Sequence, residues 1–281
     1  MRLTHGWHVA CLIAALLLPG IATAAPMHVV STFLCTDEYV FRLVPRERIA
    51  ALSFLSADRH PVVSTIADKV KGIRLIRGSA EEIMPLHPDL VVTEDANPRL
   101  LAQLAEAGIR VLQVKDPMSL ADVRDVTREL GAALGESERA ETMLAEMDRK
   151  LAAAARVAPH PSVRTLIYEP NGYATSGGVT NEILRTAGLE NAGPSMNQTR
   201  LGTVPIEAVI ASPPELLILN GEREATPSRG DLILRHPALR ALPASTMIAR
   251  AHLTPLLCPG PWSADVALPL AELGRRAGVQ N

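Results

Sequence analysis

The chain has 281 residues, and its 28 basic and 30 acidic side chains nearly cancel. This balance argues against a nucleic-acid surface, which needs a concentration of positive charge. Residues 1–24 instead predict an export signal, because Arg2 precedes an apolar run from Val9 to Leu18 and Ala22-Thr23-Ala24 forms an A-x-A cleavage site. The run is shorter than the roughly 20 apolar residues that span a bilayer. We therefore expect the signal to be removed, leaving an exported soluble protein.

Two cysteines remain after this cleavage, Cys35 and Cys258. An oxidising compartment allows two thiols to pair, but sequence alone does not place their Cα atoms within bonding distance. Three alternatives stay open for these cysteines. They form a disulfide across a cleft, they act as a pair of soft ligands across a cleft, or they are buried as small apolar residues in separate cores. Aromatic residues make up only 3% of the chain, and Trp262 is the one tryptophan that follows the signal.

Short apolar runs alternate with amphipathic stretches, which predicts an α/β architecture with parallel sheets. The strands expected in the first half are His28–Leu34, Ile49–Phe54, Asp89–Thr93 and Arg110–Val114. They are apolar on both faces, as parallel strands covered by helices are. A helix is expected over Asn97–Ala107, where Gly108 provides a stop signal.

The middle of the chain predicts two consecutive helices. The first begins after Ser119, with Asp122 three residues on in a capping arrangement. The second covers about Glu136 to Val157 and has strong helix formers at most positions. About 20 residues at 1.5 Å each give a rod of roughly 30 Å, the width of a small domain. The sequence Ala158-Pro159-His160-Pro161 ends it.

A second α/β set follows this rod. It comprises strands at Val163–Glu169 and Glu215–Leu219, a further strand within Thr246–Leu257, and helices at Thr180–Ala187, Pro205–Ser212 and Ala264–Ala277. The fold class is therefore α/β, with two lobes, each a mainly parallel sheet flanked by helices, bridged by one long helix. We assign residues 25–135 to the first lobe, 136–158 to the bridging helix and 159–281 to the second lobe.

Several local motifs carry a resemblance to a known family. They are Gly78–Ile83 leading into Leu86–Val92, Ala105–Val114, Ala187–Asn191, Val204–Glu207, and Pro213–Ile218. These segments, in this order, resemble the periplasmic binding proteins for iron–siderophores, haem and cobalamin. The first pair resembles that family's "G-x-x-x-E-x-I…L-x-P-D-L-V" segment and is the most specific match. Pro205 and Glu215 depart from the pattern, and we expect Pro205 to open its helix at the first turn.

The resemblance implies a periplasmic location, a monomer, and delivery of a small-molecule metal chelate to the membrane permease subunits of an ABC importer. A ferric siderophore-like ligand is favoured over haem and cobalamin, because stacking aromatics are scarce. It also implies that Glu81 and Glu207, one on each lobe, pair with arginines of the permease. The resemblance implies no enzyme activity, no cofactor, no bound metal of the protein's own and no nucleic-acid partner.

The ligand is expected beyond the carboxyl ends of the strands, where open α/β sheets bind their ligands. Loops at those ends carry arginines suited to carboxylate or catecholate oxygens, and aromatic rings suited to flat surfaces. The candidate ligand-binding residues are Cys35, Asp58, His60, Arg77, Glu94, Tyr168, Tyr173, Arg200 and Trp262.

Two other functions have weaker support in the sequence. A receptor for a bare divalent metal ion would need three or four convergent His, Asp or Glu ligands, whereas the histidines are scattered along the chain. An exported hydrolase would need a catalytic motif, and no G-x-S-x-G, H-E-x-x-H, phosphate loop or C-x-x-C is present. The identity of the ligand does not follow from the sequence.

Overall fold

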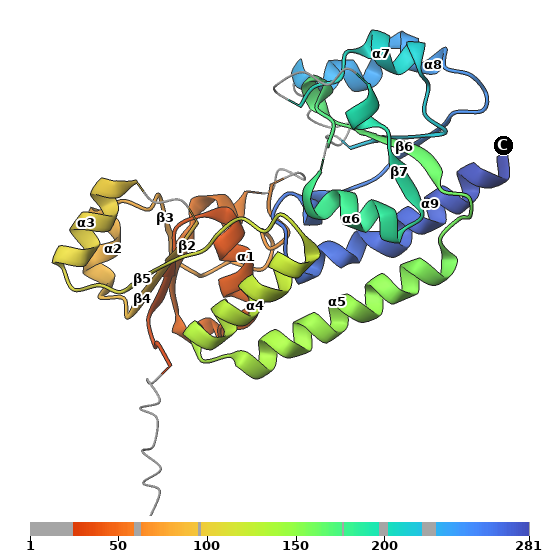
Figure 1. Cartoon of the computed structure of the whole chain (residues 1–281). Helices are drawn as coiled ribbons and strands as arrows, with labels where there is room; N and C mark the ends of the chain where they lie inside the picture. The colour runs from red at the N-terminus through yellow and green to blue at the C-terminus, as the bar shows by residue number, and fades with distance from the viewer. Residues whose placement is uncertain are drawn as a thin grey trace, which may run out of the picture.

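A computed structural model describes residues 25–58, 63–94, 97–175, 177–196, 202–220 and 229–280. The predicted signal at residues 1–24 lies outside these ranges, as do His60 and Arg200. Figure 1 shows two lobes, the first coloured red to yellow and the second mostly green to blue, with the long helix α5 running along both. No helix in the described ranges combines the length and apolar character needed to cross a bilayer.

The first lobe is built on a five-stranded parallel sheet in the order β3-β2-β1-β4-β5. Its strands are β1 (Val29–Ser31), β2 (Ile49–Ser53), β3 (Leu75–Ile76), β4 (Leu90–Thr93) and β5 (Val111–Gln113). Its helices are α1 (Leu34–Leu43), α2 (Ala80–Ile83), α3 (Pro98–Glu106) and α4 (Leu120–Leu134). Buried residues of β1 and β4 pack against both layers of helices, which confirms the expectation of strands covered on two faces.

The second lobe holds a four-stranded parallel sheet in the order β7-β6-β8-β9. Its strands are β6 (Val163–Tyr168), β7 (Leu189–Asn191), β8 (Leu216–Leu219) and β9 (Met247–Arg250). Its helices are α6 (Gly178–Thr186), α7 (Ile206–Ala211), α8 (Pro237–Arg240) and α9 (Ala267–Gln280). The two-lobed fold class expected from the sequence is confirmed.

Helix α5 (Ser137–Val157) is the predicted rod. Its first buried residue, Ala140, packs into the core of the first lobe, whereas Leu144, Met147 and Leu151 pack into the core of the second. Gly131 of α4 allows α4 and α5 to pack closely, because a Cβ at that position would lie 2.6 Å from the Cβ of Ala140. The helix is thus shared between the lobes.

Two sequence expectations about local structure were wrong. The first strand was predicted to reach Leu34, with a ligand-facing loop after it, but β1 ends at Ser31 and Leu34 begins α1. The apolar run that suggested a strand is the buried face of this helix, a choice that a short apolar run leaves ambiguous. Pro205 was expected inside the first turn of its helix, but it occupies the N-cap position of α7.

The Pro-Asp and Pro-Glu motifs that carried the family resemblance have a structural role in the fold. The Asp89 carboxylate, just before β4, accepts hydrogen bonds from the backbone N–H groups of Met27 and His28 at 2.7 and 2.8 Å. Glu215, just before β8, accepts one from the backbone N–H of Arg164 in β6 at 2.8 Å. In each lobe this carboxylate ties the start of one strand to its neighbour. Glu215 therefore replaces aspartate without loss of the contact.

The C-terminal part of the chain is not confined to the second lobe. After β9 it crosses to the first lobe, where Cys258 and Trp262 join the core formed by Tyr39, Val40 and Leu43. It then returns to form α9 against α5 and the second sheet. Trp262 is only 6% exposed, and its ring meets that of Tyr39 edge-on with centroids 4.7 Å apart. This segment therefore connects the lobes in addition to α5, and the division at residue 159 stays a prediction.

We predict that Trp262→Ala lowers the free energy of unfolding by about 3–5 kcal/mol, the usual cost of emptying a buried aromatic site. Urea denaturation followed by circular dichroism measures this loss. Phe54→Ala is the matched control, because Phe54 is 48% exposed, and its removal is expected to cost less than about 1 kcal/mol. Equal losses for the two variants would contradict the placement of Trp262 in the core.

Candidate ligand groove between the lobes

A cavity of about 490 Å³ opens at the carboxyl edge of the second sheet. Its wall comes from the end of β6 and the segment after it, including Glu169, Asn171 and Tyr173, and from Asn220 after β8. Thr180 of α6 also lines it, as does the segment that crosses to the first lobe, Leu253 to Leu257. A volume of this size is typical of small-molecule sites, and the position matches the expected edge of an open α/β sheet.

The first lobe contributes a small recess of about 10 Å³ at the carboxyl edge of its own sheet. Glu94 follows β4, Lys115 and Asp116 follow β5, and Cys35 lies in the first turn of α1. Pro259, from the crossing segment, completes the lining. The crossing segment thus lines both the large cavity and the recess. We define the groove as the cavity, the recess and the floor of residues 253–259 that joins them.

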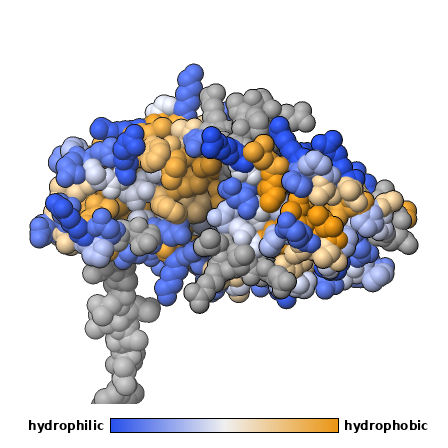
Figure 2. Space-filling view, turned by 90° about the horizontal axis from the view of Figure 1, so that it is seen from above, coloured by the Kyte–Doolittle hydropathy of each residue, from blue (hydrophilic) through white to orange (hydrophobic). Residues whose placement is uncertain are grey.

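Exposed aromatic rings gather at the carboxyl edges of the strands. Phe33, Phe54 and Tyr173 are 37%, 48% and 43% exposed, and they follow β1, β2 and β6 respectively. The guanidinium of Arg77, just after β3, lies 5.2 Å from the centroid of the Phe54 ring. Figure 2 shows an apolar area on the part of the first lobe that faces the second. Of these rings, Tyr173 lines the cavity, whereas Phe33 and Phe54 line neither the cavity nor the recess.

Glu169 is the acidic group of the large cavity. Burial raises the pKa of its carboxyl, and the hydrogen bond from Asn220 opposes this shift. The Asn220 side-chain amide donates to Glu169 Oε1 at 2.5 Å, and the Asn220 oxygen accepts from the backbone N–H of Leu253 at 3.2 Å. Asn220 therefore connects the carboxylate of the cavity to the first residue of the floor.

The structure places the predicted ligand-binding residues in different surroundings. Tyr173 lines the large cavity, Glu94 and Cys35 line the recess, and Arg77 is exposed beside Phe54. Asp58 is half-buried at the end of a 3-10 turn after β2. Their ligand contacts stay predictions. His60 and Arg200 lie outside the described residues.

Tyr168 and Trp262 require correction, because both were expected on the groove and both are buried. The Tyr168 side chain is fully buried in the second lobe and donates to the Val204 carbonyl at 2.9 Å. Trp262 donates to the Cys258 carbonyl at 2.9 Å and packs in the first core. Both residues follow predicted strands in the sequence, but the direction in which each ring points is not a local property.

Cys35 and Cys258 form a disulfide across a sequence separation of 223 residues. Of the alternatives left open by the sequence, pairing between the first lobe and the C-terminal segment is the one found.

Glu169, Asn220 and Leu253–Leu257 were missed as cavity residues. Glu169 and Asn220 are polar residues that directly follow strands, and this pattern in the sequence was enough to suggest them. The floor carries no such sequence pattern.

The two candidate docking glutamates are exposed, one on each lobe. Glu81 lies in the first turn of α2, and hydrogen bonds from its own backbone N–H and from Ser79 hold its carboxyl pKa below the usual range. The neighbouring Glu82 instead accepts from the backbone N–H of Arg77 at 2.8 Å, which closes the turn. Glu207 lies in the first turn of α7. Neither Glu81 nor Glu207 is inside a core.

The comparisons with known proteins agree with this geometry. Residues 55–246 match the profile of a family described as "Periplasmic binding protein". The chain belongs to this family. As a periplasmic binding protein it is a solute-binding protein and not an enzyme, which confirms that expectation. No curated protein matches it in sequence.

Solved structures share the fold of this periplasmic binding protein. A periplasmic heme-binding protein from Roseiflexus sp. RS-1 is 22% identical with a TM-score of 0.66, and the match covers 89% of this chain and 98% of the other. The periplasmic heme-binding protein of Vibrio cholerae is 18% identical with a TM-score of 0.70, covering 88% and 98%. The vitamin B12-binding protein of Vibrio cholerae is 17% identical with a TM-score of 0.66, covering 90% and 98%.

Asp37 of α1 makes the stability of the first lobe depend on pH. It is fully buried beside β2, where the backbone N–H and hydroxyl of Ser53 donate to it. Burial raises its pKa from 3.8 to about 7, despite the hydrogen bonds from Ser31 and Ser53. Because the folded pKa exceeds the unfolded one, the protonated form favours folding. Stability from this group is complete below pH 3.8 and is lost as the pH rises to about 7.

We predict that Asp37→Asn removes this loss. Between pH 4 and pH 8 the wild type should lose on the order of 2–4 kcal/mol more unfolding free energy than the variant does. Urea denaturation of both proteins at the two pH values gives the double difference, which cancels the titration of all other groups. A wild type and variant with the same pH dependence would show that Asp37 titrates normally.

Proposed function

We propose that this protein is the periplasmic substrate-binding component of an ABC importer that captures a metal chelate and delivers it to the membrane permease. The observation that carries the proposal is the groove, a cavity of about 490 Å³ at the carboxyl edge of one parallel sheet, continued by a floor that reaches the other lobe. Family membership supports ligand capture as the activity. The predicted export signal supports a periplasmic location, and the monomer stays an expectation from the family resemblance.

The walls of the groove favour a chelate with an apolar organic surface. Tyr173, Leu256 and Leu257 line the cavity, and Phe33 and Phe54 are exposed after strands of the first lobe. Aromatic and aliphatic side chains contribute most of the burial energy in small-molecule sites, and a few polar groups fix orientation. A ferric siderophore-like ligand fits this surface. Haem and cobalamin are less favoured, because among the described residues Tyr173 is the one aromatic side chain that lines the cavity.

The two rival functions have less support. Within the described ranges, no three His, Cys, Asp or Glu side chains come together as a group able to hold a metal ion, so no observation favours a receptor for a bare divalent ion. The exported hydrolase is excluded by membership in a family of binding proteins. The groove therefore argues for capture of an intact chelate.

Docking to the permease rests on Glu81 and Glu207. Both side chains are exposed in the first turn of a helix, on different lobes. A carboxylate in such a position forms charge-assisted hydrogen bonds with arginine guanidinium groups. Neither residue lines the large cavity or the recess, so docking and ligand capture use separate surfaces.

We predict that protein purified from its own periplasm carries a ligand, visible by native mass spectrometry as a mass added to the chain. Glu81→Ala and Glu207→Ala should each retain this ligand and reduce its uptake by cells at least about tenfold, because the loss of a charge-assisted pair is worth about 1.5–3 kcal/mol.

The controls for this experiment are Glu106→Ala and Glu190→Ala, which remove exposed carboxylates from the same two lobes. Both should transport normally. Loss of the co-purified ligand in Glu81→Ala or Glu207→Ala would show that these residues serve the groove. Normal uptake by both variants would reject the docking role, and the absence of any ligand mass would reject the proposed function.

A further inference from the structure

A second cavity, of about 500 Å³, lies on the second lobe at its edge strand β9, and we call it the edge cavity. Leu219 of β8 and Arg250 of β9 are in register, and side chains alternate along a strand, so Leu219, Ile248 and Arg250 share one face of the sheet. The opposite face, with Leu216 and Ile218, packs against α5 and α9. The edge cavity shares no lining residue with the cavity of the groove.

The floor of the edge cavity is apolar. Leu219, Leu234 and Leu239 are each at most 5% exposed and belong to one core cluster. Ile248 continues this floor toward solvent and is 41% exposed, because β9 is the last strand of the sheet and α8 covers it only in part. The apolar part of a ligand that covered Ile248 would gain the free energy of removing that surface from water.

The rim of the edge cavity is basic. Arg235 ends the 3-10 helix before α8, Arg240 ends α8 and Arg250 ends β9, and all three side chains are exposed. His236 also lines the cavity, and its Nδ1 accepts from the backbone N–H of Ala238 at 3.3 Å. The neutral ring therefore carries its proton on Nε2. The side chains of the rim offer hydrogen-bond donors to a ligand.

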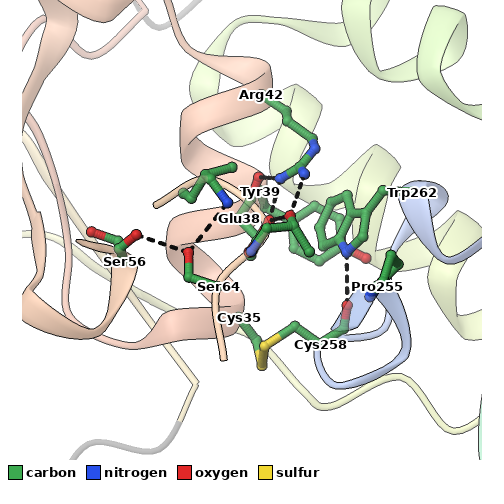
Figure 3. Close-up of polar contacts among 12 residues, drawn as sticks. Cys35, Glu38, Tyr39, Arg42, Ser56, Ser64, Pro255, Cys258 and Trp262 are labelled. Carbon is green, nitrogen blue, oxygen red and sulfur yellow. Dashed lines mark hydrogen bonds and ion pairs between the residues drawn. A yellow bond between two sulfur atoms is a disulfide. The ribbon is translucent and has the colours of Figure 1, made fainter. Parts of the chain in front are cut away.

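The charges of this rim are not neutralised within the described part of the chain. No described aspartate or glutamate lines the edge cavity, and its three arginines form no ion pair with a described residue. Other arginines of the chain are paired, as Arg42 is with Glu38 (Figure 3) and Arg48 is with Glu136. Like charges around one cavity repel each other, and the low-dielectric walls strengthen their field. A bound anion would offset this repulsion.

We propose that the edge cavity is a second binding site, for an amphipathic anion that joins a carboxylate or phosphate group to an apolar chain. The chain lies on the floor and covers Ile248, and the anionic group accepts hydrogen bonds from the rim arginines. Guanidinium groups match carboxylate and phosphate oxygens in pairs. A cavity of about 500 Å³ has the size of a small-molecule site. This site does not rest on the proposed function of the groove.

Isothermal titration calorimetry of the purified protein tests the site with octanoate and with octyl phosphate. At least one of them should bind, and the tighter one identifies the anionic group. Octanol, which lacks the charge, and inorganic phosphate, which lacks the chain, should bind at least about tenfold more weakly. Absence of binding by both octyl anions would overturn the proposal. Equally tight binding of inorganic phosphate would also overturn it, because the chain would then contribute nothing.

Single variants place the bound anion at the edge cavity. Arg240→Gln and Arg250→Gln should each weaken binding at least about tenfold, because each removes a charge-assisted contact, and Ile248→Ser should weaken it through lost apolar contact. Arg275→Gln, which removes an exposed arginine of α9, is the matched control and should bind as the wild type does. Leu257→Asp, which alters an exposed residue of the groove, should also bind normally.

All five substituted side chains are exposed, so the variants are expected to fold, which circular dichroism checks. Loss of binding in Leu257→Asp with retention in the rim variants would place the anion in the groove and reject the proposal. Equal weakening by Arg275→Gln and the rim variants would indicate attraction to the overall charge of the lobe and would reject it as well.

Discussion

The contact between one face of α1 and the segment around Trp262 is the constraint on which the two-lobed arrangement depends. Apart from this contact, the lobes are joined through α5 and through α4, whose Val123 packs into the second core and whose Leu120 N–H donates to Glu182 at 2.7 Å. Around this contact the chain crosses to the first lobe and then returns to form α9, and it is held there by a buried aromatic pair, a cation–π contact and a disulfide. Two well-separated connections resist relative rotation of the lobes far better than one. The groove therefore has a defined width before any ligand arrives.

A preformed groove is consistent with separate surfaces for the proposed ligand capture and the proposed docking to the permease. The proposed ligand capture uses the cavity at the carboxyl edge of the second sheet, where Glu169, Tyr173 and Leu253–Leu257 meet. The exposed glutamates proposed for docking lie outside that cavity. A binding site that needs little reorganisation loses less conformational entropy on capture. A rigid connection between the lobes also holds the two docking carboxylates at a fixed separation, which a membrane partner would be able to recognise.

The sequence predicted the fold well and the site only in part, for identifiable physical reasons. Long periodic segments such as α4 and α5 were recovered almost to the residue, because caps and amphipathic spacing are local. Strands of two or three residues, such as β3, leave too little pattern to recognise. The position of Trp262 depends on a crossing between lobes, which is a long-range property. Local composition therefore suggested a ligand contact where the fold uses the ring as an anchor.

Small-angle X-ray scattering tests the central claim, that two connections hold the lobes around a preformed groove. The ligand-bearing protein from the periplasm is compared with the same preparation after its ligand has been stripped, both with the disulfide intact. The account predicts that the radii of gyration agree within about 1 Å, since a helix-braced pair of lobes closes little. A compaction of several ångströms on ligand binding would contradict it.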